Sequence, residues 1–209
     1  IVVFISIASM ILGSFAAINQ RNIKRLMAYS SIGHVGYALI GLSVGSEAGI
    51  RAVLIYLAIY LFMNIGTFAC ILCMRRGGRM VEGIDDLAGL GKTHPMIALA
   101  LAIFMFSMAG IPPLAGFFGK LYIFQAAIAV EFYTLAIIGV LTSVVGAFYY
   151  LRIIQIMYFD NTEDPLDQSV DREIGTLLTF TGILIVAFIA YPEPLVSNAA
   201  AAAASLFAG

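Results

Sequence analysis

Apolar residues occur along this chain in six long runs, separated by short polar or charged segments. A helix needs about 20 apolar residues to cross the hydrocarbon core of a bilayer. The runs lack strand-like alternation, and only helices or closed barrels satisfy every backbone polar group in lipid. We therefore predict an all-α fold, a polytopic membrane helix bundle with about six transmembrane segments in a single domain. The predicted spans cover residues 1–18, 26–44, 52–74, 95–130, 132–158 and 174–191.

The positive charges of the connecting segments fall almost entirely on one side of this predicted bundle. Of the eleven Lys and Arg residues, only Arg51 falls on the other side, and Lys120 lies inside a span. Cytoplasmic loops carry an excess of Lys and Arg. We therefore place the loops after the first, third and fifth spans in the cytoplasm or its equivalent. The charges on that side are Arg21, Lys24, Arg25, Arg75, Arg76, Arg79, Lys92, Arg152 and Arg172.

The fourth run, residues 95–130, is too long for one continuous span. As an unbroken helix it would extend for about 54 Å, against a hydrocarbon core of about 30 Å. Pro112 and Pro113 lack the amide proton and disfavour helix in the residues before them, while Gly110 and Gly116 permit unusual backbone angles. The pattern predicts one crossing built from two half-helices, with a break at Gly110–Gly116, as in the ion sites of transporters.

Lys120 follows this break and lies eleven residues before Glu131, too far inside the span to reach the surface easily. A charge near the middle of a membrane costs at least ~2.5–3.5 kcal/mol, so it persists where it faces a polar interior and has a function. Burial disfavours the charged form of lysine, whereas a carboxylate or water favours it. Lys120 is therefore a candidate proton-carrying group. The alternative is a structural lysine paired with a carbonyl or a carboxylate.

The third span carries a polar stripe. Tyr56, Tyr60, Asn64 and Thr67 are spaced by four, four and three residues, which places them on one helical face. A polar stripe in lipid turns toward the bundle interior. It can line a hydrated route, or it can hydrogen-bond to neighbouring helices, and the sequence does not separate these two interpretations.

His34 is the histidine inside a predicted span, and it shares a face with Ser30 and Tyr37. Histidine can titrate near neutral pH, which makes His34 a candidate member of a proton path, although a lone histidine is also a common packing residue. Glu131 is a further candidate for this path and is expected to mark a tight turn between the fourth and fifth spans.

Composition supports a membrane protein. Hydrophobic residues make up 62% of the chain and charged residues 11%, against about 25% charged residues in soluble domains. A net charge of −1 gives no sign of nucleic-acid binding. Cys70 and Cys73 lie inside an apolar run without a nearby third ligand, so we assign them no metal and no cofactor. The opening "IVVFISIASMILGSFAAI" lacks the features of a signal peptide, and we expect the chain to be a C-terminal piece of a longer protein.

Two segments carry a family resemblance. "NIKRLMAYSSIGHVGYALIGL" and "FMFSMAGIPPLAGFFGKLYIFQAAI" together resemble motifs of the antiporter-like membrane subunits of respiratory complex I, the NADH:quinone oxidoreductase. The likeness covers essentially the whole chain. Another branch of the family would be expected to carry Glu where Lys120 stands. The lysine, with "AYSSIGHVGY" and "EGIDDLAGLGKTHP", therefore points to one particular branch.

The resemblance implies an architecture and a role. Members of the family resemble fourteen-helix proteins with two inverted five-helix repeats, each containing one broken helix. This chain would supply the second inverted repeat and a final helix. Lys120 matches the lysine that the family uses as a proton relay on the second broken helix. The implied function is proton translocation, coupled through this buried lysine to quinone reduction elsewhere in an enzyme complex.

The resemblance also implies what surrounds the chain. NADH, FMN, iron–sulfur clusters and quinone are expected in other subunits, with no cofactor in this one. Expected partners are the other membrane-arm subunits, including neighbouring antiporter-like subunits, and the lipid bilayer. The expected location is the bacterial inner membrane, or the mitochondrial inner membrane for an organellar protein. Two alternatives stay open: a subunit of a multisubunit cation/proton antiporter, and a passive membrane scaffold.

Overall fold

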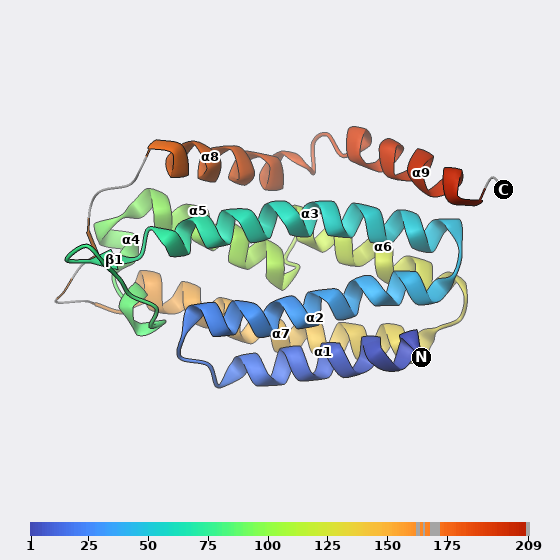
Figure 1. Cartoon of the computed structure of the whole chain (residues 1–209), viewed down its shortest axis with the longest axis horizontal. Coiled ribbons are helices and arrows are strands. Elements are labelled where there is room, and N and C mark those ends of the chain that lie inside the picture. The colour runs from blue at the N-terminus through green and yellow to red at the C-terminus, as the bar shows by residue number, and fades with distance from the viewer. Residues whose placement is uncertain (162–163, 165, 168–171, 208–209) are drawn as a thin grey trace.

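The computed structural model describes residues 1–161, 164, 166–167 and 172–207, which form an elongated bundle of helices (Figure 1). Connections at both ends of the bundle return the chain along the same axis (Figure 1). The elements are α1 (Val2–Ile18), α2 (Ile23–Val44), α3 (Glu47–Leu72), β1 (Arg75–Arg76), β2 (Arg79–Met80), the 3-10 turn η1 (Asp85–Leu87), α4 (Leu90–Thr93), α5 (Pro95–Ala109), α6 (Ala115–Ala129), α7 (Tyr133–Phe159), α8 (Arg172–Ala187) and α9 (Glu193–Phe207).

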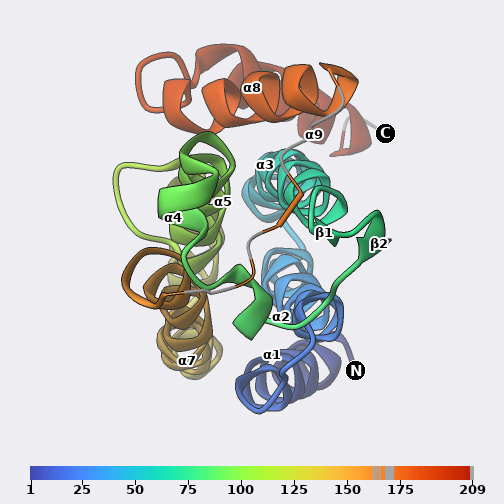
Figure 2. The same cartoon turned by 90° about the vertical axis from the view of Figure 1, so that its left-hand side faces the viewer.

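The helices form two layers with a cover. Helices α1, α2 and α3 lie in one layer and α5, α6 and α7 in the other, while α8 and α9 run along the side formed by α3 and α5 (Figure 2). Both chain termini lie at the same end of the bundle (Figure 1). The antiparallel β1–β2 pair is the only sheet within the described residues. The all-α prediction is confirmed.

Length and hydropathy single out the two longest helices. Helices α3 and α7 contain 18-residue stretches with mean hydropathies of 2.0 and 1.9 and are long enough to cross a bilayer, whereas α1 and α6 are apolar but shorter. A bend of 120° separates Asp85–Thr93 from α5, so α4 turns away from the bundle axis. The helices follow the predicted runs closely, and the exact boundaries of the membrane spans stay a prediction.

The fourth run is broken where the prolines predict it. Helix α5 ends at Ala109, and α6 begins at Ala115. Gly110 caps α5 with a left-handed conformation at φ 83°, which an L side chain rarely adopts. The peptide bond between Pro112 and Pro113 is cis. The predicted discontinuity at Gly110–Gly116 is therefore confirmed.

The C-terminal segment differs from the expected single helix. The predicted span 174–191 becomes α8, which ends at Ala187, and a further helix, α9, follows the break at 188–192. The sequence pattern missed α9 because its alanine run is only weakly apolar. Alanine is nevertheless the strongest helix former, and Glu193 in the first turn favours the helix N-terminus.

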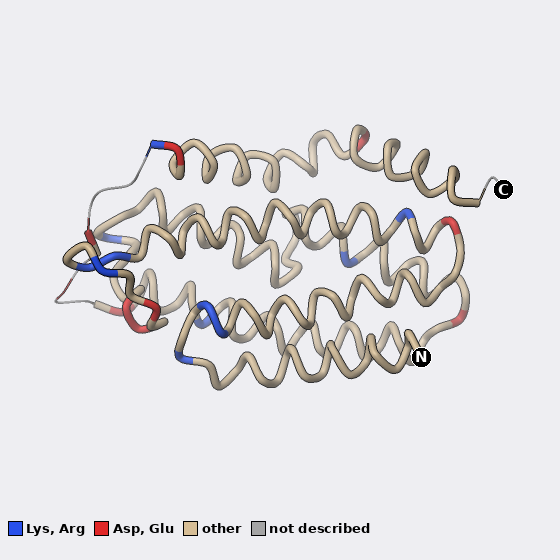
Figure 3. Tube along the Cα trace, viewed as in Figure 1, with Lys and Arg blue, Asp and Glu red and all other residues tan. Residues whose placement is uncertain are grey.

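Positive charge gathers at the end of the bundle that carries β1 and β2 (Figure 3). The loops after α1 and α3 lie together there, and Asp167, a described residue of the loop after α7, donates its amide proton to the Arg75 carbonyl at 2.8 Å. Two of these loops are bonded to each other: Ile23 donates its amide proton to the Glu82 carbonyl at 2.8 Å, and Ile84 donates to the Arg21 carbonyl at 2.8 Å. The Glu82 carboxylate accepts from Lys24 Nζ at 2.7 Å and from Asn22 Nδ2 at 2.8 Å.

These contacts predict a pH dependence for the joined loops. The hydrogen bond from Lys24, together with that from Asn22, lowers the pKa of Glu82 below its ordinary value. A carboxyl whose folded-state pKa is lowered stabilises the fold above its unfolded pKa of about 4.3, and the contribution disappears as pH falls through the folded value. Hydrogen exchange at the Ile23 and Ile84 amides, corrected for intrinsic rates, should therefore accelerate in that acidic range.

The matched comparison is Glu82→Gln against Glu193→Gln at the start of α9. Glu82→Gln should remove the acid-dependent change in exchange at these two amides, whereas Glu193→Gln should leave it intact. Equal pH dependence in Glu82→Gln and the unmodified protein would contradict this assignment.

Candidate functional site

The break between α5 and α6 is held together by Ser107. The Ser107 Oγ accepts from the Gly116 amide at 3.0 Å and donates to the Met63 sulfur of α3 at 3.0 Å. A Cβ on Gly116 would lie 1.9 Å from the Ser107 carbonyl oxygen. Glycine is therefore required at 116, because the start of α6 touches the backbone of α5 directly.

Lys120 lies in the second turn of α6 and folds back toward the end of α5. Its side chain is buried, with 6% of its surface exposed. Its Nζ donates to the carbonyl oxygens of Met108 at 2.9 Å and Ala109 at 3.2 Å, and to Ser143 Oγ of α7 at 2.8 Å. The last carbonyls of a helix lack intrahelical partners and carry partial negative charge. The break thus supplies the polar setting that makes a buried ammonium group tolerable.

All three acceptors of Lys120 are uncharged. Within the residues that the structure describes, Lys120 forms no ion pair with a carboxylate. A groove of about 280 Å³ adjoins its side chain and is bordered by Gly110, Phe117, Ser143 and Val144. Lys120 is therefore hydrogen-bonded but not charge-paired, and there is space beside it.

Tyr37 of α2 lies between Lys120 and His34. The Lys120 Nζ is 5.1 Å from the centre of the Tyr37 ring, a cation–π distance. The Tyr37 hydroxyl donates to Thr142 Oγ1 at 3.3 Å, next to Ser143 in the chain. The rings of His34 and Tyr37 meet edge to face, with 5.9 Å between their centres. Tyr37 therefore joins the lysine and the histidine in one buried cluster.

His34 is buried and hydrogen-bonded through both ring nitrogens. Nδ1 lies 2.6 Å from the Tyr56 hydroxyl, and Nε2 lies 3.0 Å from the Tyr150 hydroxyl. The Tyr150 hydroxyl is also hydrogen-bonded to Ser30. A tyrosine hydroxyl can donate or accept. Either neutral tautomer of His34 is consequently satisfied by these two partners.

The predicted stripe on α3 divides into two parts. Tyr56 and Tyr60 reach α2: Tyr60 donates to Ser31 Oγ at 2.7 Å and stacks on His34, with 4.7 Å between ring centres. Thr67 instead donates to the Met63 carbonyl of its own helix at 2.8 Å. The side-chain oxygen of Asn64 is buried and has no hydrogen-bond partner among the described residues. The structure thus brings Tyr56 and Tyr60, but not Thr67, into contact with His34.

Glu131 is exposed in the turn between α6 and α7, where its φ of 62° is left-handed. The tight turn that the sequence predicts is present. Glu131 borders a small groove of about 240 Å³ with Val3, Ile7 and Phe132 at the bundle end. This groove shares no lining residue with the groove beside Lys120. Membership of Glu131 in a proton path stays a prediction.

Several members of the cluster come from α7 and were not predicted. They are Thr142, Ser143, Tyr149 and Tyr150, and the rings of the two tyrosines lie 4.4 Å apart. The spacing from Thr142 to Tyr149, and from Ser143 to Tyr150, is seven residues, which places each pair on one helical face. A search for polar stripes in the fifth span would have found them.

In the ranges 1–161, 164, 166–167 and 172–207, no three His, Cys, Asp or Glu residues are placed to hold a metal ion. Cys70 and Cys73 are buried thiols at the end of α3.

Comparison with known sequences agrees with this architecture. The family described as "NADH:quinone oxidoreductase/Mrp antiporter, TM" matches residues 1–146. The chain is 61% identical over 207 residues to NADH-quinone oxidoreductase subunit N of Paramagnetospirillum magneticum, covering 99% of this chain and 42% of that protein. It is also 61% identical over 206 residues to subunit N of Rhodospirillum rubrum, with the same coverage. It thus spans less than half the length of these relatives.

Solved structures share the fold. A chain of respiratory complex I from Thermus thermophilus is 28% identical, with a TM-score of 0.80, over 94% of this chain and 44% of that chain. A chain of the Mrp complex from Dietzia sp. has a TM-score of 0.88 at 21% identity, over 99% and 47%, and shows the fold alone. The lysine at position 120 predicted the subunit N branch, and the relatives confirm this branch. The chain therefore belongs to the NADH:quinone oxidoreductase/Mrp antiporter family of multi-pass membrane subunits, here of the subunit N type of the bacterial inner membrane.

Proposed function

We propose that the full-length protein translocates protons as a membrane subunit of NADH:quinone oxidoreductase, with Lys120 as the proton-carrying group of this half. Quinone reduction elsewhere in the complex drives the transfer. The redox cofactors NADH, FMN and iron–sulfur clusters belong to other subunits, and the partners are neighbouring antiporter-like subunits of the membrane arm. Support comes from the 61% identity to subunit N in two bacteria.

The observation that carries the role of Lys120 is its set of neutral acceptors. A carboxylate partner would hold the ammonium form in place by charge. Lys120 instead bonds to Met108 O, Ala109 O and Ser143 Oγ. The Ser143 hydroxyl accepts from the ammonium group and can donate to the neutral amine, which carbonyl oxygens cannot do. Both charge states of Lys120 therefore have a hydrogen-bond partner.

The cluster around His34 offers a continuation of the proposed proton path from Lys120 toward α2 and α3. Tyr37 and Thr142 connect the surroundings of Lys120 to the His34 ring, which contacts Tyr56 and Tyr150. Hydroxyl and imidazole groups can reverse donor and acceptor roles. We infer that His34, Tyr56 and Tyr60 form one branch of the proton path, with Asn64, Thr67 and Glu131 as further candidates.

The cation/proton antiporter alternative has weaker support. The family description names both kinds of complex, but the Mrp chain resembles this one at 21% identity, which carries the fold only. In a passive scaffold, Lys120 would only satisfy the free carbonyls of Met108 and Ala109, and arginine in its place, which keeps the charge, would leave translocation unchanged.

Ser143→Ala tests the proposal, because Ser143 is the side chain that hydrogen-bonds to Lys120 among the described residues. We expect NADH-driven proton translocation in the assembled complex, reconstituted in vesicles, to fall about tenfold. That change corresponds to about 1.4 kcal/mol, close to the lower limit of about 1.5 kcal/mol for one hydrogen bond to a charged group. Ser143→Thr keeps the hydroxyl and should stay near the unmodified rate.

Ser43→Ala is the matched control, because Ser43 Oγ donates only to the Ile40 carbonyl of its own helix, at 2.7 Å. The proposal predicts an unchanged rate for this variant. Unimpaired translocation in Ser143→Ala, in a fully assembled complex, would remove Ser143 from the path.

A further inference from the structure

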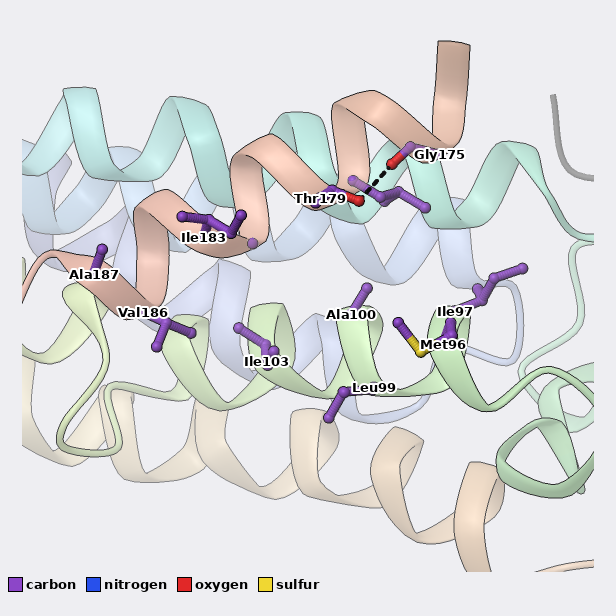
Figure 4. A pocket seen from close by; sticks show the side chains of 12 residues that line it. Met96, Ile97, Leu99, Ala100, Ile103, Gly175, Thr179, Ile183, Val186 and Ala187 are labelled. Atoms are coloured by element: carbon purple, nitrogen blue, oxygen red, sulfur yellow. Dashed lines mark hydrogen bonds between the residues drawn. The ribbon is translucent and has the colours of Figure 1, made fainter. Parts of the chain in front are cut away.

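An apolar groove of about 550 Å³ runs between α5 and α8 (Figure 4). One wall is formed by side chains of α5, among them Met96, Ala100 and Ile103, and the other by side chains of α8, among them Ile183 and Val186. The polar group drawn in the groove, the Thr179 hydroxyl, already donates to the Gly175 carbonyl at 2.9 Å (Figure 4). The groove therefore offers an apolar surface and no unsatisfied hydrogen-bonding group along its walls.

Two glycines of α8 keep the groove open. A Cβ added at Gly175 or Gly182 would meet no atom within 4 Å, and neither residue has a left-handed conformation. Glycine inside a helix is less favourable than alanine. Neither backbone conformation nor close packing within the described chain explains these two glycines. Space for an external apolar group does explain them.

The dimensions of the groove fit one hydrocarbon chain. From Gly175 to Ala187 the α8 wall extends for about 18 Å at 1.5 Å per residue, close to one leaflet of a hydrocarbon core of about 30 Å. Dividing the volume by this length gives a cross-section of about 30 Å², or a width of about 6 Å. A helix with its side chains is about 10–12 Å wide. One hydrocarbon chain can thus lie between the walls of the groove, whereas a helix would lie across its rim.

Positive charge lies at one mouth of the groove. Arg172 precedes the groove residue Gly175 by three residues at the start of α8. Lys92 lies in α4, which precedes α5 and is bent by 120° from it. Within the described residues neither cation forms an ion pair; Lys92 Nζ donates to the neutral Asn161 Oδ1 at 2.7 Å. Glu173 follows Arg172. Lys and Arg beside a membrane attract anionic lipid headgroups.

We propose that the α5–α8 groove binds one acyl chain of an anionic phospholipid of the bilayer, with its headgroup at Lys92 and Arg172. In a membrane the acyl chain is already surrounded by hydrocarbon, so contact with the groove gains only packing. Attraction between the phosphate and the two cations therefore provides the selectivity. This site is separate from the Lys120 cluster and does not depend on the proposed proton path.

Photocrosslinking tests the site in the complete protein within its membrane complex, in phosphatidylcholine nanodiscs. The probe is phosphatidylglycerol with a photoreactive acyl chain, and crosslinked peptides are identified by mass spectrometry. We expect crosslinks on α5 and α8 at the groove, at least fivefold more than with a phosphatidylcholine probe. Gly182→Leu, which fills the groove, should reduce them at least fivefold. Ala100→Leu fills it from the other wall, should do the same, and replaces Gly182→Leu if that variant fails to assemble.

Matched controls separate the groove from the general lipid surface. Thr176→Leu adds an apolar side chain to an exposed site on α8 outside the groove and should leave crosslinking unchanged. Arg172→Gln should reduce the preference for phosphatidylglycerol, whereas Arg51→Gln at the other end should not. Three results would overturn the proposal: crosslinks that survive both filling variants, equal yields from the two lipids, or a groove covered by another protein segment that excludes both probes.

Discussion

Gly116→Ala is expected to disrupt the junction of the two half-helices and to destabilise the protein by about 3 kcal/mol, the upper range for overpacking a close contact. The added Cβ would lie 1.9 Å from the Ser107 carbonyl oxygen and 2.7 Å from its carbon. These are backbone atoms of α5, which cannot rotate away as a side chain can. Either α5 and α6 separate, or the hydrogen bond from the Gly116 amide to Ser107 Oγ is lost. The measurement is the thermal stability and yield of the assembled complex.

Gly175→Ala is the control for this prediction. It makes the same change inside a helix where the Cβ meets open space, and alanine favours the helix by up to about 1 kcal/mol. Stability should be equal to or slightly above that of the unmodified protein. If Gly116→Ala were as stable as Gly175→Ala, the contact between Gly116 and Ser107 would not constrain the break.

Lys120→Met is expected to reduce proton translocation by the assembled complex to less than a tenth of its normal rate. Methionine has a similar length and apolar stem, so the packing of α6 against α5 changes little. The variant removes the group that carries the proton and leaves Ser143 without its charged partner. The rate is measured from the acidification of vesicles during NADH oxidation, together with the subunit content of the complex.

Lys120→Arg separates a proton carrier from a structural cation. Arginine keeps a positive charge and can donate to the carbonyls of Met108 and Ala109, but it does not release a proton in proteins. The groove beside Lys120 offers about 280 Å³ for the larger group. A structural role predicts normal translocation in Lys120→Arg, whereas the proton-carrying role predicts the same loss as in Lys120→Met.

Much of this architecture was predictable from hydrophobic pattern and length. The proline pair and the excessive length of the fourth run gave the break, and the distribution of Lys and Arg gave the common side of three loops. Helix α9 was not predicted because its alanines carry little hydropathy, although they favour helix strongly. The break at 188–192 contains Pro192, which cannot continue a helix, directly before α9. Phe188 in this break packs on Phe118 of α6.

The surroundings of Lys120 were predictable only in part. Its position inside a predicted span marked the residue itself, and the stripe on α3 indicated Tyr56 and Tyr60, which contact His34. Its partners depend on tertiary structure: the Met108 and Ala109 carbonyls are available because α5 ends there, and Ser143 comes from another helix. The sequence spacing that grouped Thr67 with the tyrosines could not show that its hydroxyl bonds to its own helix.

The protonation state of Lys120 during turnover tests the central claim most directly. Solid-state NMR of the assembled complex with ¹⁵N-labelled lysine side chains distinguishes an ammonium group from a neutral amine, and Lys120→Arg identifies the signal by removing it. Our account predicts that the Lys120 signal shifts between the two states when NADH oxidation begins. A Lys120 signal that keeps one protonation state at rest and during turnover would contradict it.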